Sequence, residues 1–353
     1  MTASLRVGTY SIRLDPGSSE VANLAQVALC TADLPRTIRT FVDVLGFRNA
    51  GGRPRWGEYA SRVHELPTGD DTYVMMWWLV GRQEFVQIEL FHHTSPAQRP
   101  RRPGWRPSDL GWVRFGVTVP DFDLTMRRLH GAGLTTMTSP VDVDGRRRVC
   151  VREPGADAIV EIMEETVGSH APALAYVAAS VSDLEGARRY FGEVFGFPEI
   201  QSDAIHRPEH EAMWGLDGAR RACAVFRAGD VLLEVMHYET PRPKAPAADA
   251  LLSDQGIMNV AIGHRDRAEM LDALAAAESL GASTTTDPPP VSGATYLRIS
   301  DRLSVELLLV PPDLDGAYGF SPQDLAPPGS AFAPEVAASL MARDSDRPRR
   351  DRE

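Results

Sequence analysis

Four glutamates, each set between apolar residues, are the positions in this sequence that could do chemistry as a group. They are Glu89, Glu161, Glu234 and Glu306, and the steps from Glu89 to Glu234 and from Glu161 to Glu306 are both 145 positions. A lone glutamate on a strand ordinarily faces water, but four at matched places in matched repeats predict a pocket-facing role. Two carboxylates that meet in an apolar pocket can act in acid–base catalysis near neutral pH.

Each glutamate closes one copy of a repeated unit. Residues 24–47 and 174–197 share the order strand, Asp-Leu turn, amphipathic helix and hydrophobic-Gly-Phe ending, and residues 113–134 and 258–282 are weaker copies. In the first unit, Asp33 is the predicted N-cap of the helix. The alternating pattern at a constant offset indicates that a two-unit half has been duplicated. Each unit reads β-α-β-β-β, and four strands with open edges need a partner unit to cover their apolar face.

The sequence therefore predicts an α+β protein. Its four βαβββ modules are expected to pair, each with the next along the chain, into two half-open, eight-stranded, barrel-like sheets with the helices outside. The predicted parts are an N-terminal extension (1–22), a first paired domain (23–165, modules 23–95 and 110–165), a second paired domain (174–310, modules 174–240 and 255–310) and a partly disordered C-terminal tail (311–353) with one short helix at 334–343.

The composition of the chain limits the classes of partner that it could bind. The chain has 353 residues, 43% hydrophobic content and a formal net charge of −11, which argues against a nucleic-acid or anionic-membrane partner. No apolar run reaches the roughly 20 residues that span a bilayer, and the N-terminus lacks a secretory signal. Cys30, Cys150 and Cys223 are widely spaced and odd in number. We expect a cytoplasmic protein, a monomer or homodimer, that binds a small molecule.

These features resemble the vicinal oxygen chelate superfamily, which includes glyoxalase I, bleomycin-resistance proteins, methylmalonyl-CoA epimerase and extradiol dioxygenases. The resemblance rests on the paired βαβββ units, their strand–Asp-Leu–helix–Leu-Gly-Phe openings and the closing glutamates, over residues 22–310. It implies the fold but does not fix the reaction, because this fold hosts several chemistries and some binding-only members.

The resemblance also implies a second site position on the opening strand of each module. These positions carry Gln26, Arg114, Tyr176 and Asn259, where family members often have His. Arg114 offers five donors and no lone pair, so it would take a metal's place rather than bind one. The pocket predicted for the first barrel is structural and consists of Gln26, Glu89, Arg114 and Glu161.

The second barrel is the predicted catalytic one, with Tyr176, Glu234, Asn259 and Glu306. Tyr176 could donate a proton beside a carboxylate base. No cofactor is expected, although Glu234, Asn259 and Glu306 could hold a hard divalent cation there.

The predicted substrate-binding residues are Trp77, Met236, Trp214 and His210. Trp77 and Trp78 are neighbours on a strand, so only one of them faces inward. His206 and His210 have a spacing found in metal sites, but Pro208 between them forbids a regular helix. That stretch therefore reads as a loop over the mouth of the third module.

The leading functional hypothesis is an enzyme that transfers protons on a small oxygenated aromatic or polyketide-like molecule, by isomerisation, cyclisation or elimination, without the usual His-bound metal. One alternative is a ligand-sequestering, resistance-type protein without turnover. The third is a metal-dependent ring-cleaving dioxygenase with unusual ligands.

Overall fold

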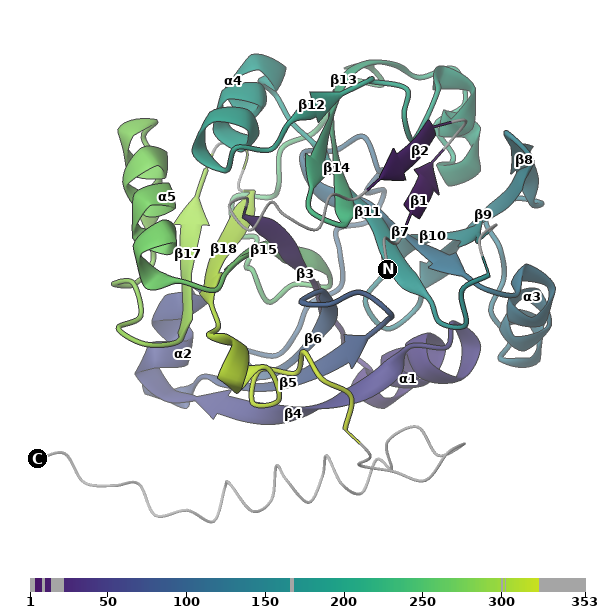
Figure 1. Cartoon of the computed structure of the whole chain (residues 1–353). Coiled ribbons are helices and arrows are strands. Elements are labelled where there is room, and N and C mark those ends of the chain that lie inside the picture. Colours follow the sequence, from purple (N-terminus) through teal and green to yellow (C-terminus); the bar gives the residue numbers. More distant parts are fainter. Residues whose placement is uncertain are drawn as a thin grey trace, which may run out of the picture.

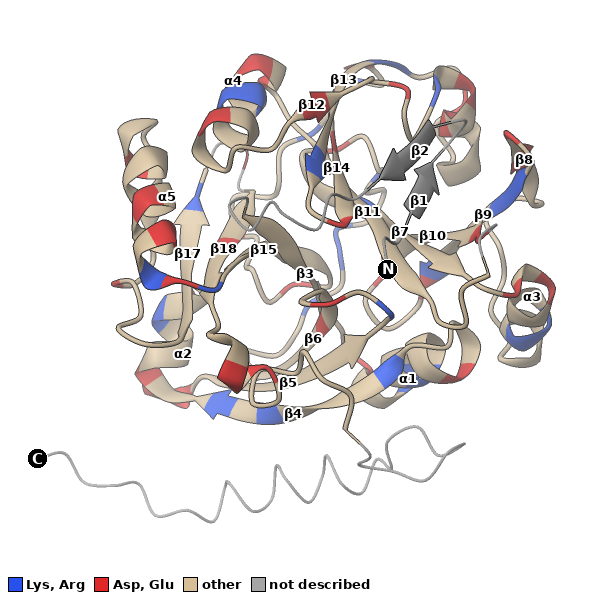
Figure 2. Ribbon diagram, in the orientation of Figure 1, with Lys and Arg blue, Asp and Glu red and all other residues tan. Residues whose placement is uncertain are grey.

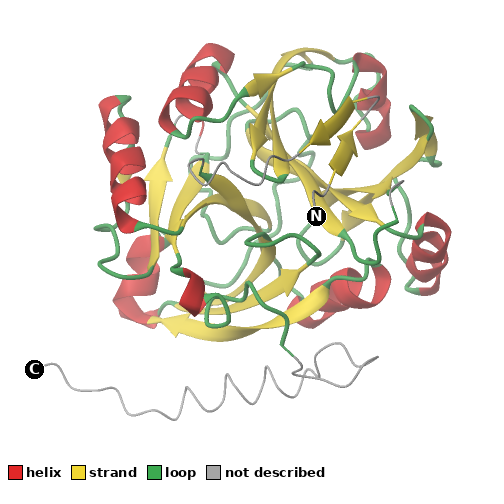
Figure 3. Cartoon of the chain, in the orientation of Figure 1, coloured by secondary structure: helices red, strands yellow, loops and turns green. Residues whose placement is uncertain are grey.

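Two eight-stranded mixed sheets with helices on their outer sides organise the chain in the computed structural model (Figure 1). The structure describes residues 4–7, 10–13, 22–165, 168–299, 301 and 303–323. Figure 3 shows the strands curling around two centres with the helices at the periphery. The predicted α+β architecture of four βαβββ modules in two sheets is confirmed. No helix in the described stretches is long and apolar enough to cross a membrane.

The first and fourth modules form one sheet, here named the terminal sheet. Its strand order is β16-β17-β18-β15-β3-β6-β5-β4, and the opening strands β3 and β15 pair antiparallel at its centre. The strands are β3 (Asn23–Cys30), β4 (Arg48–Trp56), β5 (Tyr73–Val80), β6 (Gln87–Ser95), β15 (Gly256–His264), β16 (Ser283–Thr284), β17 (Gly293–Arg298) and β18 (Ser304–Leu309).

The second and third modules form the other sheet, named the central sheet. Its order is β12-β13-β14-β11-β7-β10-β9-β8, with β7 and β11 antiparallel at the centre. The strands are β7 (Gly111–Val119), β8 (Val141–Val143), β9 (Arg146–Glu153), β10 (Ala158–Glu164), β11 (Ala173–Ser180), β12 (Glu199–Ile200), β13 (Arg220–Ala228) and β14 (Val231–Thr240). Strands β1 (Ser4–Val7) and β2 (Tyr10–Arg13) form a separate antiparallel pair.

The predicted pairing of consecutive modules is therefore wrong. The physical reason lies in the connections, because sequential elements joined by a short segment usually become neighbours. Residues 165–172 join the second module to the third, whereas the longer linkers 96–110 and 241–255 carry the chain from one sheet to the other. Each predicted domain consequently contributes half of both sheets.

One helix follows each opening strand, and an aspartate caps its N-terminus. The Arg36 amide donates to Asp33 Oδ1 at 3.1 Å, as predicted for that helix, and Asp121, Asp183 and Asp266 cap the other three. The helices are α1 (Leu34–Arg39, continued by the π-turn Thr40–Val44), α2 (Gly57–Val63), α3 (Phe122–Gly131), α4 (Leu184–Arg189, continued by the π-turn Tyr190–Val194) and α5 (Arg267–Ser279), with 3₁₀ turns at Gly69–Asp71, Pro208–Trp214 and Pro312–Leu314.

The helices and the outer faces of both sheets share one apolar core, whereas the concave faces hold separate clusters. The neighbours Trp77 and Trp78 on β5 divide between them. Trp77 is buried in the shared core, its indole donates to Asn49 Oδ1 at 2.8 Å, and it does not line the two larger cavities described below. Trp78 faces the concave side and donates to Glu89 Oε1 at 2.8 Å.

The C-terminal tail is described as far as residue 323. A 3₁₀ turn at Pro312–Leu314 begins it, and the Phe320 ring then packs against that of Phe85 in a tilted arrangement, with ring centroids 4.6 Å apart. The first part of the predicted tail is therefore packed against the terminal sheet. The helix predicted at 334–343 and the final charged residues lie outside the described residues.

Candidate active site

The strand register explains why the four glutamates lie at matched places. Each closing strand runs parallel to the opening strand of its own module, and its glutamate sits opposite a small residue two positions beyond the opening-strand site. All four glutamates are buried. The register pairs are Ala28 with Glu89, Gly116 with Glu161, Ala178 with Glu234, and Ala261 with Glu306.

An arginine fills the middle of the central sheet. Arg114 is fully buried, and its Nη2 donates to Glu234 Oε2 at 2.6 Å. Its guanidinium carbon lies 3.8 Å from the centroid of the Trp214 ring. Arg221 approaches the other oxygen of Glu234 at 3.2 Å. An arginine thus occupies the interior, as predicted, but its carboxylate partner is Glu234 and not Glu89.

A histidine bridges the two glutamates of the central sheet. His206 Nδ1 lies 2.8 Å from Glu234 Oε2, and its Nε2 lies 2.7 Å from Glu161 Oε2. The Tyr176 hydroxyl donates to the same Glu161 oxygen at 2.6 Å. Burial opposes ionisation of all these groups, but the two carboxylates raise the pKa of His206, and His206 with Arg148 lowers the pKa of Glu161 to about 2. Both ring nitrogens of His206 face carboxylate oxygens, an arrangement that favours the imidazolium form, which donates from both nitrogens.

These contacts leave little room for a ligand. The cavity that reaches Tyr176 measures about 30 Å³, the space of about one water molecule. The segment predicted as a loop over the third module contains the 3₁₀ turn Pro208–Trp214, whose buried side chains His210, Glu211 and Trp214 cover the network. Every carboxylate in this interior has a cationic partner, so the central sheet holds a closed ionic network.

Three of the predicted substrate-binding residues belong to this closed interior. Trp214 stacks on Arg114, Met236 Sδ accepts from the same guanidinium at 3.2 Å, and His210 Nδ1 accepts the Arg207 amide at 3.1 Å. None of them lines the larger cavities described below.

The predicted catalytic set also divides. Tyr176 and Glu234 lie in the central sheet, whereas Asn259 and Glu306 lie in the terminal sheet. The predicted structural set divides in the same way, with Arg114 and Glu161 in the central sheet and Gln26 and Glu89 in the terminal sheet.

The terminal sheet surrounds an open cavity of about 400 Å³. Gln26, Glu89 and Glu306 line it from the opening and closing strands, and Trp78 and Tyr296 form part of its wall. The Tyr296 hydroxyl hydrogen-bonds to Glu306. Asn259 Nδ2 contacts Glu306 Oε2 at 3.4 Å, at the edge of hydrogen-bond distance.

In the described part of the chain, no arginine is bound to the two carboxylates of this cavity. Burial raises the pKa of Glu306 to about 7, against the partial opposing effect of its bonds to Tyr296 and Asn259. Burial and the charge of Glu306 raise the pKa of Glu89 well above its ordinary value. At neutral pH the pair therefore retains a proton, and it can both give and accept one.

Two arginines from β4 stand at the mouth of the cavity. Arg53 lies between the rings of Trp78 and Tyr318, at 5.4 and 4.8 Å from their centroids, and its Nε is buried without a hydrogen-bond partner. Within the described residues, neither Arg53 nor Arg55 forms an ion pair with a carboxylate. Figure 2 shows these basic positions along β4. Exposed Trp56 and Tyr59 complete the rim.

Sequence reasoning assigned no role to these mouth residues. The available signal was the order Arg-Pro-Arg-Trp at 53–56, in which Arg53 and Arg55 share one face of an extended strand.

The donor atoms around the two carboxylates also suit a cation. Gln26 Oε1 and Asn259 Oδ1 are buried, and neither has a hydrogen-bond partner in the described protein. With Glu89 and Glu306 they form an all-oxygen set, which fits a hard ion such as Mg²⁺ or Mn²⁺. The described part of the chain contains no group of three or more His, Cys, Asp or Glu residues that could hold a metal. The set does not fit the nitrogen or sulfur preference of zinc.

Paired βαβββ modules that present closing-strand glutamates to a concave sheet define the vicinal oxygen chelate class of protein. The chain belongs to the glyoxalase/bleomycin resistance protein/dioxygenase superfamily, because models of that family match residues 25–151 and 173–301. These two matches coincide with the duplicated halves of the sequence, each of which contains two modules.

Solved structures agree on the fold. Glyoxalase I from Zea mays is 16% identical, with a TM-score of 0.55 over 82% of this chain and 92% of that chain. A protein titled as a candidate dioxygenase from Bacillus subtilis is 12% identical, with a TM-score of 0.58 over 93% of this chain and 96% of that chain. A search of curated proteins found no match. At these identities the likeness establishes the fold alone.

Proposed function

We propose that the protein is an enzyme that transfers protons on a small oxygenated molecule bound in the 400 Å³ cavity of the terminal sheet. The observation that carries the proposal is the pair Glu89 and Glu306, two buried carboxylates that face an open cavity and bind no arginine among the residues the structure describes. The same positions in the central sheet are neutralised and covered. The terminal sheet therefore keeps reactive carboxylates, whereas the matching carboxylates of the central sheet stabilise the fold.

The chemistry follows from the protonation of the pair. Ionised Glu306 accepts a proton from a carbon next to a substrate carbonyl, and the electrons of that C–H bond move toward the carbonyl oxygen. Protonated Glu89 donates to that oxygen, which gives an enol. Return of a proton at another carbon completes an isomerisation, and loss of a leaving group completes an elimination. Tyr296 and Asn259 hold Glu306 in position.

The cavity wall favours an oxygenated aromatic or polyketide-like substrate. Trp78 and Tyr296 offer flat apolar surfaces, and the volume lies within the range of small-molecule sites. Arg53 and Arg55 at the mouth would bind a carboxylate, an enolate or a ring of oxygens on the outer end of such a molecule.

The test uses a panel of cyclic β-diketones and hydroxy-aromatic ketones in deuterated water, with solvent deuterium incorporation followed by NMR. Glu306→Gln is expected to lower the exchange rate at least about 100-fold, the lower range for removing a general base. Tyr176→Phe, in the closed copy, should keep most of the rate. Loss of exchange in Tyr176→Phe with retention in Glu306→Gln would place the chemistry in the central sheet and contradict the proposal.

Binding without turnover is a second candidate, and the unpaired arginines at the mouth favour it. A resistance-type protein would hold an anionic ligand at Arg53 and Arg55 and release it unchanged. Tight binding of a panel member, with no deuterium incorporation above the protein-free rate at any pH between 6 and 9, would support this reading over the first.

We further propose that Gln26, Glu89, Asn259 and Glu306 can hold Mg²⁺ or Mn²⁺, which would supply a Lewis acid to the substrate carbonyl. Protein purified without chelator is expected to contain no stoichiometric iron or zinc by elemental analysis. Millimolar Mn²⁺ should raise the melting temperature by roughly 2 °C or more. Glu306→Gln should abolish that increase, and Glu58→Gln, on the exposed face of α2, should preserve it. One iron per chain that is lost in Glu306→Gln would favour the dioxygenase instead.

A further inference from the structure

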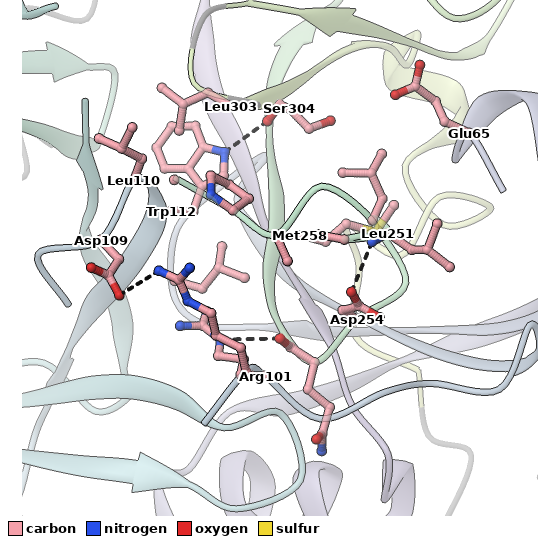
Figure 4. A pocket seen from close by; sticks show the side chains of 18 of the residues that line it. Glu65, Arg101, Asp109, Leu110, Trp112, Leu251, Asp254, Met258, Leu303 and Ser304 are labelled. Atoms are coloured by element: carbon pink, nitrogen blue, oxygen red, sulfur yellow. Dashed lines mark hydrogen bonds and ion pairs between the residues drawn. The ribbon is translucent and has the colours of Figure 1, made fainter. Parts of the chain in front are cut away.

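A second and larger cavity, of about 900 Å³, lies where the two linkers pass between the sheets. Residues of both linkers form one side, and strands β7, β15, β17 and β18 form the other (Figure 4). The indole of Trp112 faces it and donates to the backbone oxygen of Ser304 at 2.9 Å. Tyr296 belongs to the walls of both cavities, so the two cavities are neighbours. No other residue of this larger cavity takes part in the proposed proton transfer.

Four arginines line this cavity, and three of them have carboxylate partners. Arg99 binds Asp254 at 2.7 Å, Arg102 binds Asp109 at 3.0 Å, and Arg298 pairs with Glu65. These partners also line the cavity, so most of its charge is already balanced.

Arg101 is the exception. Its Nε donates to the backbone oxygen of Gln255 at 3.2 Å, but the guanidinium forms no ion pair within the described residues, and its Nη1 is buried without a hydrogen-bond partner. The nearby carboxylate of Asp157 is bound to Arg152 at 2.8 Å. Burial lowers the pKa of Arg101 to about 10, which leaves it a cation at neutral pH.

The surroundings of Arg101 are aromatic and apolar. Its guanidinium carbon lies 3.8 Å from the centroid of the Trp105 ring, which orients the group without cancelling its charge. Trp112, Met258 and Leu303 line the cavity beyond it. Arg101 is half-buried, and its guanidinium has no counter-ion among the described residues, so a ligand anion at this place would be stabilised.

We propose that this cavity is a second binding site, for an organic acid with a single carboxylate and an aromatic or aliphatic body. The carboxylate binds the one unpaired guanidinium, Arg101, and the body packs against Trp105, Trp112 and Met258. A single unpaired cation favours one negative charge over the two or three of a phosphate ester. The volume accommodates a molecule of drug size.

The test compares naphthalene-2-carboxylate with its neutral carboxamide by calorimetry on the full chain. The carboxylate is expected to bind at least tenfold more tightly than the amide. Arg101→Met should reduce this preference to less than twofold, and Arg101→Lys should retain part of it. Arg48→Met is the matched control, because that arginine also donates to a backbone oxygen at 3.2 Å, that of Gly81, but lies outside the cavity, and its removal frees no carboxylate beside Arg101.

Two further variants locate the ligand. Leu252→Trp narrows this cavity and should weaken the binding of both the carboxylate and the amide. Arg55→Met, at the mouth of the other cavity, should leave the affinity for both ligands unchanged. Equal binding of acid and amide by the parent protein would overturn the proposal. So would an undiminished preference in Arg101→Met, or a preference that disappears in Arg55→Met. If Arg101→Met does not fold, Arg101→Lys and Leu252→Trp still decide the matter.

Discussion

Glu234→Gln is expected to lower the free energy of unfolding by about 3–5 kcal/mol, the range measured when one partner of a buried ion pair is removed. The substitution keeps the shape of the side chain and deletes only its charge. Glu234 Oε2 accepts from Arg114 at 2.6 Å and from His206 at 2.8 Å, and Arg221 approaches Oε1 at 3.2 Å. Without the charge, three buried cations lose their common partner.

Urea unfolding at pH 7 measures this effect. The control is Glu209→Gln, which makes the same chemical change in an exposed pair with Arg207 at 4.0 Å and should cost less than about 1 kcal/mol. The charge of His206, followed by that of Arg114, holds the pKa of Glu234 well below its ordinary value despite burial, so its contribution is present above pH 4.5 and is lost as the pH falls. The difference between parent and variant should therefore shrink in acid. Similar midpoints for Glu234→Gln and Glu209→Gln would contradict the closed network.

Glu306→Gln is expected to have the opposite effect and to stabilise the protein by roughly 3 kcal/mol above pH 7. The pKa of Glu306 is raised from 4.5 to about 7 in the folded protein because the group is buried. Between these values the unfolded chain releases a proton that the folded chain keeps, so the stability of the parent falls as the pH rises. A glutamine has no charge at any pH and avoids this loss.

The measurement is the free energy of unfolding from pH 4 to pH 8.5. The parent should lose stability across pH 4.5–7, and Glu306→Gln should lose much less, whereas Glu58→Gln should follow the parent. Parallel curves for the parent and Glu306→Gln would show that this carboxylate is solvated. The gain in stability with a loss of exchange activity is the trade-off expected of a functional group held in an unfavourable place.

The features predicted correctly from the sequence are local ones. The order of strands and helix within a module, the cap at Asp33 and the matched placing of the closing glutamates all depend on patterns within about 70 residues, and short-range periodicity encodes them. The choice of partner module is not local. It depends on the length and path of the linkers. The apolar faces of the four modules are too similar in sequence to indicate which module pairs with which.

The assignment of catalytic residues followed that error. Tyr176 and Glu234 were grouped with Asn259 and Glu306 because consecutive modules were expected to pair, and the structure separates them into two sheets. Periodicity also does not decide which of Trp77 and Trp78 faces the cavity, because it identifies the two faces of a strand without indicating which one is concave. The bridging role of His206 depends on a folded loop that no repeat pattern describes.

The pairing of the first module with the fourth orders events during synthesis of the chain. The central sheet uses one continuous stretch, from β7 to β14, so it can form on the ribosome before the last module has been made. Strand β3 can pair with β6 early but must wait for β15, because this antiparallel neighbour is made only after the whole central sheet. Contacts of such long sequence separation close slowly. The ionic network of the central sheet can thus assemble first. The cavity with Glu89 and Glu306 is enclosed only when the first and fourth modules meet.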